Sequence, residues 1–211
     1  MTNTKKRTYE NRMCIFGLES ESQHANNLRM LLRNSESIGN RLLAGEYAKS
    51  TIATNALILE RLLEKESRPS LAERAMIDNV ARETMMVAER YSKGEAPEFA
   101  KILIENAKEW TSDLIFSGKM EDIANALRKG LYPAEKYGES GDVRLFASML
   151  VKTDEHIADE YFRNKNYCLE LDFALKEMIT VASKYNMTDS IKRANEMAPI
   201  TTNPSDRLLR I

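Results

Sequence analysis

The sequence has little cysteine, proline and glycine, and it has no long apolar run. Among its 211 residues there are two cysteines, five prolines and eight glycines. So few helix breakers favour long helices over a β fold with many turns. The cysteines, Cys14 and Cys168, are compatible with a reducing cytosol. Because no apolar run approaches the ~20 residues of a transmembrane helix, no membrane span is expected.

A strong net charge is also missing. The chain carries 31 basic and 32 acidic residues, which gives a formal net charge of -1. Its overall field therefore provides no attraction to nucleic acid or to anionic lipid. The N-terminus is basic but is not followed by the apolar stretch of a signal peptide. We therefore expect a cytoplasmic protein that does not engage a membrane.

Apolar residues at three- and four-residue spacing are abundant, and this spacing is typical of amphipathic helices. No stretch alternates apolar and polar residues with β-branched enrichment, so no strand is predicted. The pattern indicates seven or eight helices. One of the clearest stripes consists of Leu171, Leu175, Met178, Ala182 and Tyr185.

Short breaks between the apolar stripes predict the turns that join these helices. Glycine and asparagine tolerate the left-handed backbone conformation that ends many helices. Helices joined in this way fold back as hairpins, so the sequence predicts an all-α fold, either stacked antiparallel hairpins or a closed helical bundle. The expected turns contain Gly45, Gly94, Gly118 and Asn164, and Gly130 with Pro133 is expected to interrupt the fifth helix.

The chain is expected to contain one domain with two irregular ends. Residues 1–18 lack periodicity and predict a flexible basic arm, whereas residues 19–197 predict a single all-helical domain. Residues 198–211 contain two prolines and predict an irregular tail. Within the domain, Arg68-Pro69 breaks the helical pattern. Ser70 with Glu73 then forms a capping box, which is a strong start for the next helix.

Two segments resemble the helical hairpin of tetratricopeptide repeats. They are ADEYFRNKNY at residues 158–167 and LLAGEY at residues 42–47, the latter with Ser50 at the small position after the tyrosine. The resemblance implies a superhelical scaffold that binds proteins or peptides. The LLAGE segment followed by a long helix is also similar to the first hairpin of translin-like RNA-binding proteins, which implies binding to nucleic acid.

The densest acidic cluster contains Asp154, Glu155, His156, Asp159 and Glu160. His156 and Glu160 are one helical turn apart, so with Asp159 they are candidate ligands of a divalent ion. The favoured interpretation is an exposed acidic helix face, because charge runs usually mark a solvated surface.

No other motif predicts a metal, a cofactor or a catalytic nucleophile. Glu21 and His24 have the spacing used in di-iron bundles, but the chain contains only two histidines. We therefore expect no intrinsic metal and no cofactor. Met85 and Met86 are adjacent and cannot both face one core. One of them is expected to contact a second helix layer or a partner.

The favoured function is a non-enzymatic helical scaffold or adaptor that binds a partner protein or a second copy of itself. An alternative is an RNA- or DNA-binding protein that uses Lys5, Lys6 and Arg7 of the basic arm. A further alternative is a metal-dependent hydrolase built on the acidic helix near His156.

Overall fold

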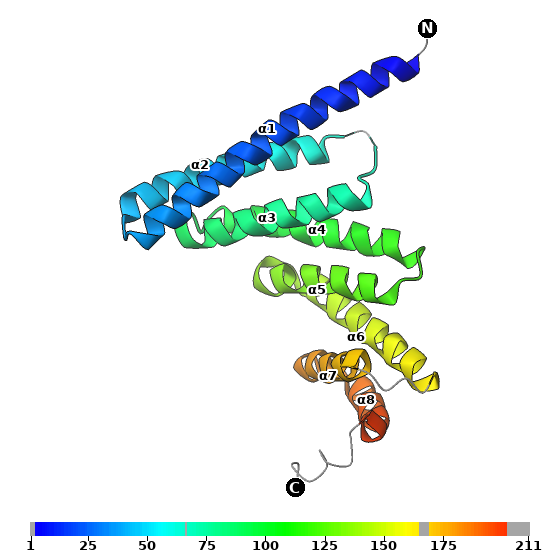
Figure 1. Ribbon diagram of the computed structural model, residues 1–211. Helices are drawn as coiled ribbons and strands as arrows, with labels where there is room; N and C mark the ends of the chain where they lie inside the picture. Colours follow the sequence, from blue (N-terminus) through cyan, green and yellow to red (C-terminus); the bar gives the residue numbers. More distant parts are fainter. Residues whose placement is uncertain (1–2, 66, 165–168, 202–211) are drawn as a thin grey trace. The chain divides into compact units, whose positions relative to one another are not determined.

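The computed structural model describes residues 3–65, 67–164 and 169–201, with side chains described between residues 20 and 198. These residues form eight α-helices and no strand, so the prediction of an all-α fold is confirmed (Figure 1). Among the described helices, none is long and apolar enough to cross a membrane. The helices are α1 (Asn3–Ser37), α2 (Arg41–Leu63), α3 (Leu71–Tyr91), α4 (Ala96–Ile115), α5 (Met120–Tyr137), α6 (Ser140–Arg163), α7 (Leu169–Lys184) and α8 (Thr188–Thr201).

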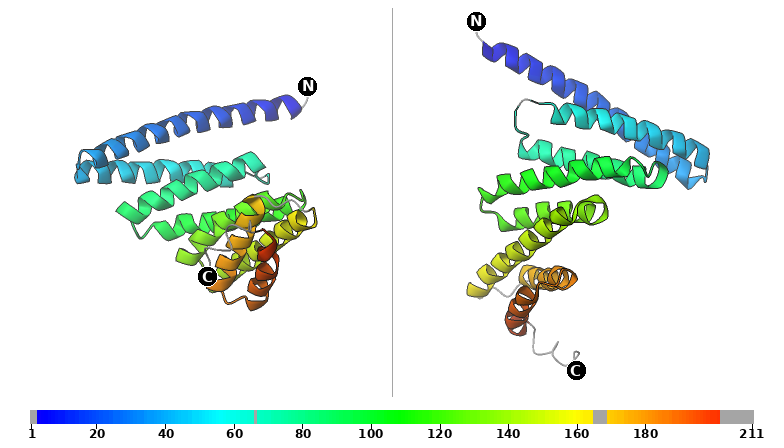
Figure 2. Two further views of the ribbon diagram at one scale, coloured as in Figure 1. Left: turned by 60° about the horizontal axis from the view of Figure 1, so that its bottom comes forward. Right: turned by 180° about the vertical axis from the view of Figure 1, so that it is seen from behind.

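The helices fall into two compact units, residues 1–103 and residues 104–211. The boundary between the units lies within α4, and the single domain expected over residues 19–197 stays a prediction. In the first unit α2 packs against both α1 and α3, and Figures 1 and 2 show α1 and α2 as antiparallel neighbours. In the second unit α6 packs against α5, α7 and α8, and α7 also packs against α8.

The turn between α1 and α2 is built by Gly39 and Asn40. Gly39 has a φ of 71°, in the left-handed region that favours glycine. The Asn40 side chain then caps α2 by accepting a hydrogen bond from the Leu43 backbone N–H at 3.1 Å. This turn brings α2 back along α1, so that Leu32 of α1 packs against Ala44 and Ala48 of α2.

The start of α3 follows the capping-box prediction. Ser70 accepts a hydrogen bond from the Glu73 backbone N–H, and Glu73 accepts one from the Ser70 backbone N–H at 2.8 Å. The contact with Lys65, followed by the hydrogen bonds with Ser70, lowers the pKa of Glu73 to about 2. The turns predicted at Gly94 and Gly118 are also present, the latter with a φ of 69°.

The second unit has one continuous apolar core. Helices α5, α6 and α7 contribute most of it, and part of α4 and α8 complete it. Phe146 of α6 is fully buried against the backbone of α5 at Gly130. A Cβ atom at residue 130 would lie only 2.5 Å from the Phe146 ring and 2.7 Å from the Ala107 Cβ atom. The absence of a side chain at Gly130 is therefore required by this packing.

Two predicted breaks were wrong because the residues lie inside helices. Gly45 is within α2, and the turn lies at Gly39, where the left-handed conformation is used. Pro133 is within α5. A proline has no N–H, so the Lys129 carbonyl loses its helical donor. Pro133 is buried and lies near the end of α5, so the helix loses this one backbone hydrogen bond and still continues to Tyr137.

The ends of the chain also differ from the predicted pattern. Helix α1 begins at Asn3, so the backbone of the predicted arm is helical where the structure describes it. Helix α8 extends to Thr201, beyond the predicted start of the tail. The predicted turn at Asn164 follows the end of α6, and its residues 165–167 lie outside the described part of the chain.

The two units repeat one pattern of residues and polar contacts. Helices α1 and α5 share an asparagine, an arginine and a glutamate at equal spacing. In each helix the arginine bonds the asparagine and pairs with a glutamate two helices further along the chain. The matching residues are Asn26, Arg29 and Glu36 in α1, and Asn125, Arg128 and Glu135 in α5.

The partner helices α3 and α7 repeat in the same way. Each has a glutamate that pairs with the arginine, followed at equal spacing by a tyrosine that donates to the second glutamate. Each also has an aspartate that pairs with a basic residue one turn later. The matching residues are Asp78, Arg82, Glu83 and Tyr91 in α3, and Asp172, Lys176, Glu177 and Tyr185 in α7. Helices α1 and α3 of the first unit, and α5 and α7 of the second, are therefore joined by the same set of polar contacts.

Candidate protein-binding groove

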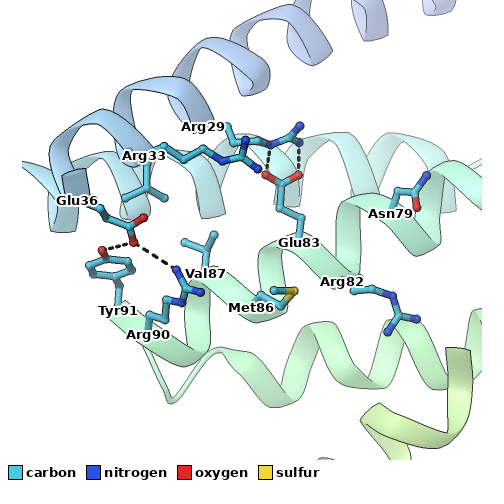
Figure 3. A pocket seen from close by; sticks show the side chains of 11 residues that line it. Arg29, Arg33, Glu36, Asn79, Arg82, Glu83, Met86, Val87, Arg90 and Tyr91 are labelled. Carbon is cyan, nitrogen blue, oxygen red and sulfur yellow. Dashed lines mark hydrogen bonds and ion pairs between the residues drawn. The ribbon is translucent and has the colours of Figure 1, made fainter.

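A cavity of about 460 Å³ lies between α1 and α3 in the first unit (Figure 3). Its lining residues recur every three or four positions along each helix, so they share one face of α1 and one face of α3. Four of them are arginines and two are glutamates. The lining consists of Arg29, Leu32, Arg33 and Glu36 from α1, and Asn79, Arg82, Glu83, Met86, Val87, Arg90 and Tyr91 from α3. We call this cavity the α1–α3 groove.

The apolar base of the groove rests on α2. Leu32 packs with Ala44 and Ala48, and Val87 and Tyr91 pack against the same cluster. Ala44 and Ala48 are almost fully buried. Their small side chains allow α1 and α3 to lie against the same stretch of α2, which fixes the two walls of the groove.

Two polar contacts join the walls directly. The Arg29 guanidinium makes a two-bonded ion pair with the Glu83 carboxylate. About two helical turns further on, the Tyr91 hydroxyl donates to Glu36 at 2.7 Å, and Arg90 lies 3.4 Å from the same carboxylate. The hydrogen bond to Glu36, followed by burial, raises the pKa of Tyr91. These contacts hold α1 and α3 at a defined separation.

Three groove residues remain open to a partner. Arg33 is exposed and makes no hydrogen bond or ion pair with any described residue, and Figure 3 shows its side chain extending into the groove. Arg90 is 64% exposed despite its contact with Glu36. Met86 is 49% exposed and lies between the charged residues, whereas Met85 is fully buried. The prediction that the adjacent methionines face different directions is therefore confirmed.

The second unit shows which groove residues are not needed to hold the helices together. The Arg29–Glu83 and Glu36–Tyr91 contacts have counterparts there, as described above. Arg33 and Met86 do not, because the equivalent positions are occupied by Tyr132 and Thr180. A cation and a flexible apolar side chain at these two places are therefore specific to the first unit.

The three candidate metal ligands share a small cavity of about 150 Å³ on α6. His156, Asp159 and Glu160 line it together with Arg163 and Asn164. Asp159 is ion-paired with Arg193 of α8 at 2.9 Å. Among the described side chains, no group of three His, Cys, Asp or Glu residues is arranged to hold a metal ion.

The acidic run of α6 was expected to form an exposed helix face, and Asp154 does not follow this expectation. His156 and Glu160 are exposed, but Asp154 is fully buried. Asp154 lies on the opposite side of α6, where α6 packs against the other helices of its unit. Lys5, Lys6 and Arg7 lie in α1, and their side chains are outside the described part of the chain.

The arginines of the α1–α3 groove were not singled out by the sequence patterns. Arg29 and Arg33 are one turn apart, and Arg82 and Arg90 are two turns apart, so each pair shares a helix face. That spacing was a usable signal. Which pairs face each other depends on how α1 and α3 pack, and periodicity along one helix does not report this.

Comparisons with protein-family models and with curated proteins find no match to this chain. The interpretation of the groove therefore depends on its own residues and geometry.

Proposed function

We propose that this chain is a helical scaffold that binds a partner protein, and that the α1–α3 groove receives an acidic segment of that partner. The carrying observation is the lining of the groove, which contains four arginines and two glutamates around the exposed Met86. Arginine suits carboxylates because its planar guanidinium forms two parallel hydrogen bonds. Methionine adapts its shape to apolar side chains between them.

An acidic protein segment fits these residues better than a nucleic acid does. Glu36 and Glu83 lie within the groove and would repel a continuous run of phosphates. A protein segment can place separate carboxylates against Arg33 and Arg90 and an apolar residue against Met86. The formal net charge of -1 also provides no general attraction to nucleic acid.

The direct test uses a labelled peptide of alternating glutamate and leucine as the probe, with fluorescence anisotropy as the readout. We expect the purified chain to bind it and the Arg33→Glu/Arg90→Glu double variant to bind about tenfold more weakly, a loss of ~1.4 kcal/mol. Arg144→Glu on α6 is the matched control, because Arg144 is an exposed arginine outside the groove. Equal binding by the double variant and the control would overturn the assignment of the groove.

A pull-down from nuclease-treated lysate extends the test to natural partners. A protein retained by the wild-type chain and by Arg144→Glu, but lost with the groove variant, would support the proposal. Recovery of nucleic acid alone from untreated lysate, abolished by neutralising Lys5, Lys6 and Arg7, would favour the nucleic-acid alternative. Metal-dependent turnover lost in Asp159→Ala would favour the hydrolase alternative, for which Asp159 would have to leave Arg193.

A further inference from the structure

A second cavity, of about 350 Å³, lies between α5, α6 and α7. Its volume is within the range of small-molecule sites. Three carboxylates and one arginine contribute its charge, and apolar side chains complete the wall. The lining residues are Glu121, Asn125, Arg128, Asp154, Ile157, Leu169, Glu170, Phe173 and Ala174.

The buried wall of this cavity contains a carboxyl group that lacks a donor. Asp154 is fully buried, and as an ionised carboxylate it accepts no hydrogen bond from a described residue at either oxygen. The nearest cation is Arg128, whose Nη2 atom lies 3.6 Å from Oδ1. That guanidinium is already bound by Glu177, with the Arg128 Nε atom 2.7 Å from the Glu177 carboxylate. An ionised Asp154 therefore accepts no hydrogen bond from a described residue and shares its cation, Arg128, with Glu177.

The first unit shows that the fold does not require a carboxylate at this place. The residue equivalent to Asp154 is Asn55 of α2, at the same distance along the chain from the paired arginine. Asn55 is also buried, with an exposed fraction of 1%. The helices of the first unit therefore pack with a neutral amide beside the Arg29–Glu83 pair. The buried carboxyl group of Asp154, which is costly to bury, is not needed for this packing.

The rest of the cavity matches an organic cation. Glu121 and Glu170 are exposed at its rim, so negative groups outnumber the single positive one, Arg128. Phe173 is 56% exposed, and the Arg128 guanidinium already lies over its ring at 5.0 Å from the centroid. Aromatic faces attract cations, and Ile157 and Leu169 offer apolar surface to a carbon chain.

We propose that the cavity between α5, α6 and α7 binds a small organic amine, whose protonated nitrogen donates hydrogen bonds to the ionised Asp154 carboxylate. The amine supplies the donors that Asp154 lacks, its alkyl chain lies against Ile157 and Leu169, and Glu121 and Glu170 attract it at the rim. This site is separate from the α1–α3 groove and does not depend on the function proposed for that groove.

Binding at this site is coupled to a proton. Burial, followed by the negative charge of Glu177, raises the pKa of Asp154 to about 8. The charged groups that face it are Arg128 from α5 and Glu177 from α7, with Glu121 and Glu170 at the rim. At neutral pH Asp154 holds a proton that it can share with Glu177. An incoming ammonium group favours the ionised form and displaces that proton.

Isothermal titration calorimetry with putrescine as the probe tests the proposal. We expect binding to strengthen as the pH rises from 6.5 to 8.5, and to release a proton at pH 7, which appears as a dependence of the heat on the buffer. Asp154→Asn should weaken binding about tenfold or more. This variant copies the residue of the first unit, so it is expected to fold. Glu60→Gln, at an exposed glutamate of α2, is the matched control.

Failure to bind putrescine, or equal affinity in Asp154→Asn and Glu60→Gln, would overturn the proposal. Saturable binding of magnesium ions at Asp154 without any response to putrescine would overturn it as well. N-acetyl-lysine amide serves as a second probe for the same ammonium group. Tighter binding of putrescine than of this probe would indicate a free amine, and the reverse order would indicate a lysine side chain of a partner.

Discussion

The α1–α3 groove and the cavity between α5, α6 and α7 are built around the same arginine–glutamate ion pair, yet several charged residues beside that pair differ between them. Arg29 with Glu83, and Arg128 with Glu177, join alternate helices of the two units in the same way. Arg33 beside the first pair is a basic residue that the second unit lacks. Beside the second pair, the first unit lacks the acidic residues Glu121, Asp154 and Glu170. The shared contacts hold the helices together, and the differences lie at the residues to which we assign the proposed binding of each unit.

The difference extends to the packing of the arginine-bearing helices. Gly130 of α5 is buried against Phe146, whereas the equivalent residue of α1 is Leu31, which is 42% exposed. The second unit therefore brings α6 closer to α5 at this point than a side chain would allow. Repetition of a polar contact does not require repetition of the apolar packing beside it.

The largest expected effect on stability comes from placing at residue 130 the leucine that occupies the equivalent position of α1. Gly130→Leu copies the residue of α1 and should lower the free energy of unfolding by about 3 kcal/mol, because the added atoms would overlap Phe146 and Ala107. Urea unfolding followed by circular dichroism measures the change. Gly45→Ala is the control, since nothing lies near its Cβ position in α2, and it should stabilise the chain by ~0.5–1 kcal/mol. Unchanged stability of Gly130→Leu would contradict the close packing.

Exchanging the buried polar residues should give the next largest effect. The folded chain retains the Asp154 proton between the ordinary carboxyl pKa and about 8, so the free energy of unfolding falls as the pH rises through that window. Asp154→Asn should remove this fall and stabilise the chain by ~1–2 kcal/mol at pH 8.5. Asn55→Asp should introduce a similar fall in the first unit.

Urea unfolding at pH 5.5, 7 and 8.5 checks both variants. A stability difference between Asp154→Asn and the wild-type chain that stays constant over this pH range would show that Asp154 is ionised throughout. The comparison of the two units would then lose its electrostatic basis.

Removing the tyrosine hydroxyls should lower the stability by similar amounts in both units, and by less than the substitutions described above. Tyr91 donates to Glu36, and Tyr185 donates to Glu135, which also pairs with Lys184 at 2.6 Å. Burial, followed by the hydrogen bond to Glu135, raises the pKa of Tyr185. Tyr91→Phe and Tyr185→Phe should each cost ~0.5–1 kcal/mol. Ultraviolet titration should show the loss of one late-titrating phenol in each variant, and no change in either titration would refute the shared contact.

Local signals along the chain predicted the helices but not their pairing. The capping box at Ser70 and the turns at Gly94 and Gly118 depend on neighbouring residues, so the sequence revealed them. The turn predicted at Gly45 was wrong because glycine is tolerated inside a helix. Whether the chain turns at Gly39 or at Gly45 depends on where α1 and α2 pack best. The helical state of Pro133 likewise depends on the surrounding core.

The residues of the α1–α3 groove and of the second cavity were harder to predict, because their placement also depends on how the helices pack. Asp154 belongs to an acidic run in the sequence, and only the packing of α6 separates it from the exposed His156 and Glu160. The ion pairs Arg29–Glu83 and Arg128–Glu177 join residues far apart along the chain. The equal spacing of Asn26, Arg29 and Glu36 with their counterparts in α5 was visible in the sequence. Its meaning became clear once both sets were seen to make the same contacts.

Substitution of Arg33 is expected to have the smallest effect on stability. It therefore tests whether a groove residue is available for binding without being needed for folding. Arg33 is exposed, has no described partner, and is replaced by Tyr132 in the second unit. Arg33→Ala should therefore change the free energy of unfolding by less than ~0.5 kcal/mol, because exposed charges outside a network contribute little. Arg29→Ala is the contrasting variant, since it leaves Glu83 without its partner across the groove. If Arg33→Ala unfolds the chain as readily as Arg29→Ala in urea, then Arg33 stabilises the helices, and its use in binding an acidic segment loses its support. If only Arg29→Ala is destabilised, Arg33 is not needed for folding and is available to bind the proposed acidic segment.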